Sequence, residues 1–128
     1  MTAPRGLPPG RTALLIDDDE DFREIVRQLL ARAGCRLREA GTGAAGLAEF
    51  ERLRPDIVIC DVNLPDMVGW DVCRRIRAAD RVTPVLLCSV RSGESSLADS
   101  LAAGANGFIP KPFESAEFLN SVGLALRL

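Results

Sequence analysis

Short apolar runs of strand length alternate along this chain with longer segments in which apolar residues recur at helical spacing. Apolar runs of about four to eight residues are typical of buried strands, and recurrence at i, i+3, i+4 and i+7 indicates an amphipathic helix. The pattern predicts strands at 12–16, 35–40, 56–60, 83–89 and 107–110, and helices at 19–34, 42–54, 70–80, 92–105 and 115–128. Residues 1–11 hold three prolines and two glycines without periodicity, so we expect a disordered tail before a single domain at 12–128.

The apolar stripe of each predicted helix marks the side that should face the core. In the first helix the stripe includes Phe22 and Ile25, and Gly34 follows at the position where helices commonly end. The fourth helix has only a thin stripe, Leu97 and Leu101, which we expect to be its buried side. Weakly packed elements open at low cost, so the fourth helix should be the easiest to move.

Five strand-then-helix units predict an α/β domain with a parallel sheet, because each right-handed crossover returns the chain to the same edge. The strands are largely apolar, as strands covered on both faces are. In such sheets the functional crevice lies beyond the carboxyl ends of the strands. The residues expected at that edge are Asp17, Asp18, Asp61, Ser89 and Lys111.

Composition narrows the classes of function. The 128 residues suit one domain, and a net charge of -2 with dispersed arginines argues against direct nucleic-acid binding. No apolar run approaches the roughly 20 residues of a membrane span, and the start has no apolar export segment, so we expect a cytoplasmic protein without membrane attachment. The four cysteines have no CxxC spacing and histidine is absent, which argues against zinc and for reduced thiols.

Lys111 is the only lysine among 16 basic residues. Chance survival is one explanation; the other is that a compact ammonium is needed to reach a single phosphate or carboxylate oxygen. Clustered carboxylates oppose one another's ionisation unless a cation is bound, and an all-oxygen ligand set indicates Mg²⁺. Asp61 could then act as a nucleophile toward a phosphoryl group, with Lys111 and Ser89 contacting the phosphoryl oxygens.

With these residues in this order, each at the end of a strand, the chain resembles the receiver domain of bacterial two-component response regulators. The resemblance extends from about residue 12 to residue 128. The family has an acidic pair after the first strand, an acceptor aspartate ending the third, a hydroxyl ending the fourth, a Lys-Pro after the fifth, and a proline and a glycine in the acceptor loop. Here these are Asp17, Asp18, Asp61, Ser89, Lys111, Pro112, Pro65 and Gly69.

The resemblance implies a doubly wound, flavodoxin-like sheet in the order 2-1-3-4-5. It implies that Asp61 is the phosphoacceptor, assisted by Lys111, and that Ser89 and Phe108 form the switch. Mg²⁺ would be held by the acidic pair, the acceptor and one backbone carbonyl, namely Asp17, Asp18, Asp61 and Asn63. The phosphoryl donor would be a sensor histidine kinase or a phosphotransfer protein, and the output a downstream effector protein or a fused domain.

A weak homodimer through the fourth helix, fifth strand and fifth helix is also expected, with Leu124 facing outward. The branch of the family with winged-helix outputs usually has an acidic pair before the switch aromatic and an arginine in the last helix. This chain has Asn106, Gly107 and Ser121 there, so such a dimer should be apolar rather than ionic.

Two other functions stay open. An aspartyl-phosphate phosphohydrolase would resemble a D-x-D signature, whereas "DVN" lacks the second aspartate. A receiver-like interaction module that never takes phosphate would not need a complete set of site residues. Single residues also have plainer explanations, such as Ser89 as an ordinary strand-end hydroxyl and Phe108 as core packing. We expect no enzymatic turnover beyond the domain's own phosphorylation and dephosphorylation.

Overall fold

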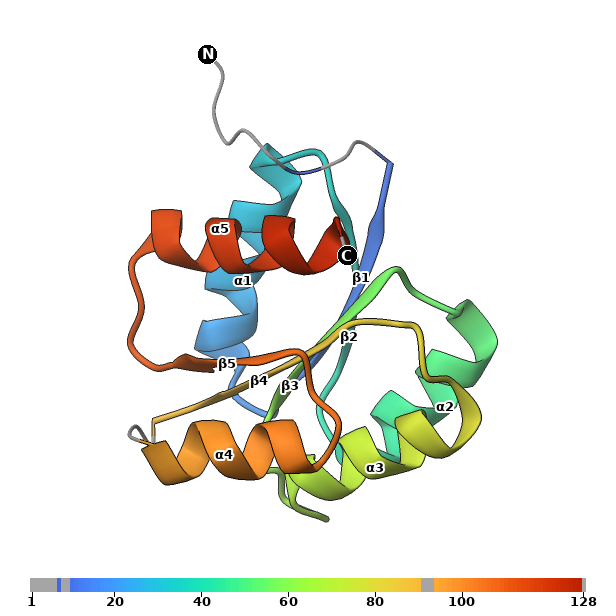
Figure 1. Cartoon of the computed structure of the whole chain (residues 1–128). Helices are drawn as coiled ribbons and strands as arrows, with labels where there is room; N and C mark the ends of the chain where they lie inside the picture. The colour runs from blue at the N-terminus through green and yellow to red at the C-terminus, as the bar shows by residue number, and fades with distance from the viewer. Residues whose placement is uncertain (1–6, 8–9, 91–93, 128) are drawn as a thin grey trace.

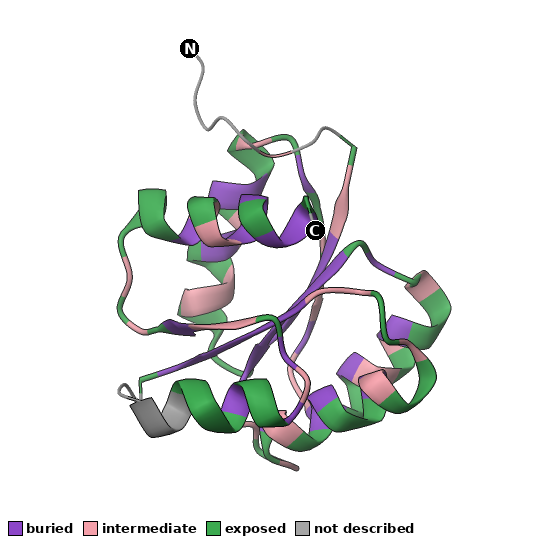
Figure 2. Cartoon of the chain, viewed as in Figure 1, coloured by how far each residue is buried: buried purple, intermediate pink, exposed green. Residues whose placement is uncertain are grey.

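Five short strands form one parallel sheet in the order β2-β1-β3-β4-β5 (Figure 1). The computed structural model describes residues 7, 10–90 and 94–127. Its strands are β1 (Thr12–Ile16), β2 (Arg36–Ala40), β3 (Ile57–Asp61), β4 (Val85–Ser89) and β5 (Gly107–Pro110). Every residue of β3 and β4 is buried, whereas β2 lies at an edge and alternates between exposed and partly buried side chains (Figure 2). The sheet class and strand order implied by the sequence are confirmed.

Helices cover both faces of the sheet, as Figure 1 shows. They are α1 (Glu20–Arg32), α2 (Gly43–Leu53), α3 (Gly69–Ala79), α4 (Glu94–Ala102) and α5 (Ser115–Leu126). Helices α1 and α5 pack on one face in a core cluster that includes Leu15, Ile59 and Phe118. Helices α2, α3 and α4 pack on the other face, around Leu14 and Val58. Within the described part of the chain, no helix has both the length and the apolar character needed to traverse a lipid bilayer.

Local sequence explains where α1 and α2 begin and where α1 ends. The Asp19 carboxylate accepts hydrogen bonds from the Asp21 and Phe22 backbone N–H groups, and the Thr42 hydroxyl accepts one from the N–H of Ala45. Such caps satisfy backbone donors that a helix leaves unpaired at its start. After α1 the chain reverses at Gly34, whose φ of 80° is costly for a residue with a Cβ.

Three predicted inward-facing leucines and isoleucines are exposed instead. Leu97 and Leu101 of α4 are 45% and 51% exposed, and Ile25 of α1 is 52% exposed. The buried side of α4 contains Ser100 and the residue after the helix is Ala103, which is also buried. Small side chains let α4 approach the sheet closely, so its two leucines are left on the outer side. The prediction was wrong for all three residues; in α4 the small residues, rather than the two leucines, decided which side is buried.

Cys60 and Cys88 lie on neighbouring strands, yet their side chains belong to the core clusters on opposite faces of the sheet. Successive residues of a strand point to opposite faces, and the register pairs Cys88 with Asp61 rather than Cys60. All four cysteines are free and buried. Burial raises the pKa of Cys88 to about 12, which disfavours the reactive thiolate. The expected reduced thiols are found. The expected tail at 1–11 lies mostly outside the described residues.

Candidate functional site

The carboxyl ends of four strands bring the predicted polar residues to one edge of the sheet. Asp17 follows β1, Asp61 ends β3, Ser89 ends β4 and Lys111 follows β5. Asp17, Asp61 and Ser89 are buried although each side chain is polar. Buried polar groups are costly unless they have partners, so each must be held by specific contacts.

Lys111 is the centre of these contacts. Its Nζ lies 2.8 Å from Oδ2 of Asp17 and 3.5 Å from Oδ1 of Asp61. The side chains of Lys111, Asp17 and Asp61 are 14%, 1% and 9% exposed, so both ion pairs are largely shielded from water. The ammonium therefore bridges two carboxylates and sits closer to Asp17.

Asp17, Asp18 and Asp61 form a compact acidic group. Each offers a carboxylate oxygen, and these atoms lie within 4.8 Å of one another. Asp18 is exposed, whereas the other two are buried. Three converging carboxylates with one side open to solvent are a donor set for a hard divalent cation that keeps some of its waters. The residues present fit such a cation.

The pKa values of Asp61 and Lys111 are both raised, for different reasons. The pKa of Asp61 is raised to about 6: burial is the largest cause and the nearby Asp17 carboxylate adds to it, while Lys111 and the Asn63 backbone N–H act in the opposite direction. Burial lowers the pKa of Lys111, but its hydrogen bond to Asp17 and its attraction to both aspartates outweigh burial, so the pKa is raised overall. The ammonium thus stays charged, and it compensates the buried charge of Asp61 only in part.

The loop after Asp61 is held tightly against the site. The Asn63 side-chain Nδ2 donates to the Ser89 hydroxyl oxygen at 3.2 Å, so the loop contacts the predicted switch residue. A Cβ on Gly69 would lie 2.3 Å from the backbone oxygen of Asp61, so only glycine allows this approach of α3. The Asp66 carboxylate accepts hydrogen bonds from two backbone N–H groups at the start of α2, at 2.7 and 2.9 Å.

Phe22 is a member of the site that the sequence did not reveal. Its ring centroid lies 3.9 Å from Nζ of Lys111, which is within the distance of a cation–π contact. Helical spacing predicted only that Phe22 would face the core. Phe108, the predicted switch aromatic, is half-buried beside the α3 and α4 face of the sheet. It is paired in register with Leu87 of β4 and is not a member of the acidic group.

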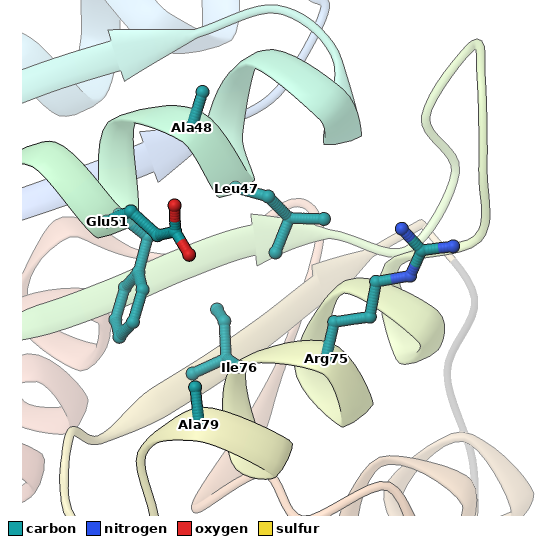
Figure 3. A pocket seen from close by; sticks show the side chains of 7 residues that line it. Leu47, Ala48, Glu51, Arg75, Ile76 and Ala79 are labelled. Atoms are coloured by element: carbon teal, nitrogen blue, oxygen red, sulfur yellow. The ribbon is translucent and has the colours of Figure 1, made fainter.

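Another hollow lies between α2 and α3. It has a volume of about 270 Å³ and is lined by apolar side chains with one acidic and one basic residue at its rim (Figure 3). The residues involved are Leu47, Ala48, Phe50, Glu51, Arg75, Ile76 and Ala79. None of these belongs to the acidic group, so this hollow is separate from the candidate site.

A doubly wound parallel sheet with an acidic group, a hydroxyl and an ammonium at its carboxyl edge defines a class of signalling domain. The family model for the response regulator receiver domain matches residues 13–123. The chain therefore belongs to the response regulator receiver family, as its strand-end residues implied.

Relatives with known names and structures agree with this assignment. The chain is 34% identical over 116 residues to the sensory transduction protein RegX3 of Mycolicibacterium smegmatis, covering 91% of this chain and 50% of that protein. It is 37% identical over 101 residues to the transcriptional regulatory protein AfsQ1 of Streptomyces coelicolor, covering 79% of this chain and 44% of that protein. The chain thus spans about half the length of these curated relatives.

Solved structures share the fold. A crystal structure from Chloroflexus aurantiacus superposes with a TM-score of 0.89 at 32% identity and covers 94% of this chain and 100% of the other. The BeF3-activated DrrB receiver domain superposes with a TM-score of 0.84 at 29% identity and covers 92% of this chain and 98% of the other.

Proposed function

We propose that Asp61 accepts a phosphoryl group from a histidine on a sensor kinase or a phosphotransfer protein. A carboxylate oxygen of Asp61 forms a bond to phosphorus, and the bond from phosphorus to the donor's histidine nitrogen breaks, with the electron pair leaving on nitrogen. One observation carries the proposal: Asp61 is a buried carboxylate that belongs to the acidic group and also lies beside a shielded ammonium. Transfer to such a carboxylate depends mainly on positioning and on neutralising charge.

The neighbouring residues supply that positioning. The Lys111 ammonium stands 3.5 Å from the acceptor and can bind a phosphoryl oxygen there. The Ser89 hydroxyl ends the adjacent strand and can donate to another phosphoryl oxygen. In this structure the Ser89 hydroxyl oxygen accepts a hydrogen bond from the Asn63 side chain. The Ser89 O–H can therefore donate to a phosphoryl oxygen on Asp61 while the contact with Asn63 is kept. Charge-assisted hydrogen bonds of this kind strengthen as negative charge develops on the transferred group.

Mg²⁺ is the cation that the acidic group would hold. Asp17, Asp18 and Asp61 provide carboxylate oxygens, and we assign the fourth protein ligand to the backbone carbonyl of Asn63. When bound, the ion supplies positive charge beside the phosphoryl oxygens. The Asp17 carboxylate also accepts a hydrogen bond from the Asp19 backbone N–H at 2.9 Å, and this contact fixes the turn that carries the acidic pair.

Phosphorylation would act through Ser89 and Phe108. A phosphoaspartate adds negative charge and acceptor oxygens, which bias an element with two arrangements. We assign that element to the loop after Ser89 together with Phe108, because α4, with exposed Leu97 and Leu101, follows this loop; residues 91–93 of the loop lie outside the described part of the chain. The output is then a changed surface read by an effector protein or by a fused domain, and direct nucleic-acid binding by this chain is not part of the proposal.

The proposal places the working domain at 12–128 and the protein in the cytoplasm. The chain is a signalling domain, and we limit its chemistry to its own phosphorylation and dephosphorylation. An interaction module that never takes phosphate is the alternative that the first experiment must exclude.

Incubation with acetyl phosphate and Mg²⁺ tests the acceptor. The protein should gain one acid-stable, base-labile phosphoryl group, seen as a mass increase, and EDTA should prevent it. Asp61→Asn should not be labelled, whereas Asp99→Asn, which removes an exposed carboxylate on α4, should be labelled normally. Equal labelling of Asp61→Asn and wild type would refute the assignment, and no labelling of wild type would support the non-phosphorylated module.

We further propose that a second copy of the chain binds weakly to the surface of α4, β5 and α5. Leu97, Leu101 and Leu124 are 45%, 51% and 63% exposed there. Shallow hollows beside β5 and α5 are lined by Phe108 and Leu124 (volumes about 420 and 380 Å³). Because this surface is apolar and offers no ion pairs to a second copy, moderate salt should leave the dimer intact. Beryllofluoride, which mimics the phosphoryl group, should promote dimerisation. Sedimentation velocity of wild type and Leu124→Asp tests this, and a tight dimer dispersed by salt would contradict it.

A further inference from the structure

Three of the five phenylalanines form a continuous aromatic ladder that ends at the sole lysine. Phe22 of α1 packs edge-on against Phe113, with ring centroids 5.7 Å apart, and Phe113 stacks on Phe118 at 4.7 Å. Phe118 is fully buried, which anchors the ladder in the core between α1 and α5. At the other end, the face of Phe22 lies 3.9 Å from Nζ of Lys111.

The ladder gives Lys111 a third partner. An ammonium has three N–H groups, and two carboxylates lie 2.8 and 3.5 Å from its nitrogen. The negative face of an aromatic ring attracts a cation, and the attraction grows when water is excluded. Because the Lys111 side chain is 14% exposed, the Phe22 ring takes a place that a water molecule would otherwise fill.

One turn of the chain places two of the three partners of the ammonium, Asp17 and Phe22. Asp19 accepts from the Phe22 N–H at 3.4 Å and donates its own N–H to Asp17 Oδ1 at 2.9 Å. The turn that orients the Asp17 carboxylate therefore also fixes the first turn of α1, from which the Phe22 ring projects over the ammonium. Phe113, two residues after Lys111, packs against the same ring in a T-shaped contact.

We propose that Phe22 is a positioning residue that holds the Lys111 ammonium beside the phosphoacceptor through a cation–π contact. Without the ring face, the shorter ion pair would draw the ammonium toward Asp17 and away from Asp61. A charge already in place needs no rearrangement when the phosphoryl group arrives, which is how fixed charges accelerate transfer. The kinetic part of this proposal rests on the proposed phosphorylation of Asp61; the contact itself does not.

The sole lysine makes the contact directly measurable. Protein labelled with ¹³C,¹⁵N-lysine should give one set of side-chain signals with a single ε-methylene carbon resonance, and the ring should shift the ε-methylene protons upfield. Phe22→Leu keeps an apolar side chain and should return this signal to the position of free lysine. A wild-type signal at the free position, or an unchanged signal in Phe22→Leu, would overturn the proposal whether or not the protein takes phosphate.

Fluorinated phenylalanine at position 22 distinguishes the electrostatic effect of the ring from its packing. Replacing Phe22 by phenylalanines of increasing fluorine content keeps the ring shape while removing its negative face. The ammonium protons should then exchange faster with water, step by step, and the rate of phosphorylation by acetyl phosphate should fall about twofold to thirtyfold over the series. The matched control is the same series at Phe118, which lies two rings from the lysine and should change neither rate.

The outcomes distinguish the two proposals. If wild type is phosphorylated but fluorination of Phe22 changes nothing, the positioning role is wrong and the acceptor stands. If equal effects follow from fluorinating Phe22 and Phe118, the ladder acts through packing and the proposal is wrong. If wild type is not phosphorylated, the proposed function fails, and the lysine signal and its exchange rate alone decide whether the contact exists.

Discussion

Replacing Asp61 by asparagine should stabilise the metal-free protein at neutral pH, although it removes the proposed acceptor. The side chains have nearly the same shape, so packing is preserved. What changes is that a buried carboxylate, 9% exposed and close to the Asp17 carboxylate, no longer has to ionise. A residue kept for chemistry at a cost in stability is expected at a functional site.

The size of the effect follows from the pKa of Asp61. Burial, and then repulsion from Asp17, raise this pKa from 3.8 to about 6 in the folded protein. A difference of about two pKa units corresponds to about 3 kcal/mol of unfolding free energy. The folded pKa is raised, so the penalty is absent below about pH 4, where Asp61 is protonated in both states. It grows as pH rises, because the unfolded chain loses the proton first, and it is complete above about pH 6.

Urea denaturation of wild type and Asp61→Asn in EDTA, at intervals from pH 4 to pH 7.5, measures this difference. The variant should gain about 3 kcal/mol relative to wild type across the interval, and added Mg²⁺ should narrow the gap by stabilising wild type. Asp99→Asn removes the same charge from an exposed position on α4 and should follow wild type. Parallel stability curves for wild type and Asp61→Asn between pH 4 and 7 would refute the reasoning.

Three further predictions concern neighbouring features. Gly69→Ala should lower the unfolding free energy by about 2 kcal/mol in urea, because its Cβ would lie 2.3 Å from the Asp61 backbone oxygen; an unchanged midpoint would contradict this. Asp80→Ala should cost about 1–2 kcal/mol at pH 7, since the carboxylate accepts from Thr83 N and Oγ1. These hydrogen bonds depress its pKa to about 2, so the loss should be full above about pH 4 and vanish near pH 2 in thermal melts. Lys111→Arg should not restore phosphorylation, and normal labelling of that variant by mass would show that the ammonium is not required.

The fold could be predicted because local patterns carried most of the information. Strand and helix periods marked the five repeating units, and most predicted ends differ from the observed ones by one or two residues. Helix α4 shows where this fails: its apolar stripe, Leu97 and Leu101, faces outward, while Ser100 is buried. In a short helix with several small residues, the side that approaches the sheet is decided by fit, which the sequence of the helix does not record.

The candidate site, like the fold, could be predicted from the sequence only in part. Asp17, Asp61 and Lys111 could be placed together, because the carboxyl ends of parallel strands meet at one edge. The contact between Phe22 and Lys111 could not, because it joins residues that are far apart in the chain and no periodic pattern connects them. A phenylalanine at a core-facing helical position has the same sequence signature whether its neighbour is a leucine or an ammonium.

Two basic residues at this edge show why one lysine was kept. Arg23 uses its planar group as a fork: Nη1 donates to the Asp17 backbone oxygen at 2.6 Å, and the other nitrogens pair with Glu20 and Glu39. Its acceptors are spread around the guanidinium, and its side chain is 17% exposed. Lys111 contacts a carboxylate oxygen of the same Asp17, and its nitrogen is also close to an Asp61 oxygen and to the ring of Phe22. A guanidinium there would bring five N–H donors to a space with too few acceptors, so the charge at this position has to be compact. The difference between a planar fork at Arg23 and a compact charge at Lys111 follows from how the acceptors are arranged around each of these two side chains.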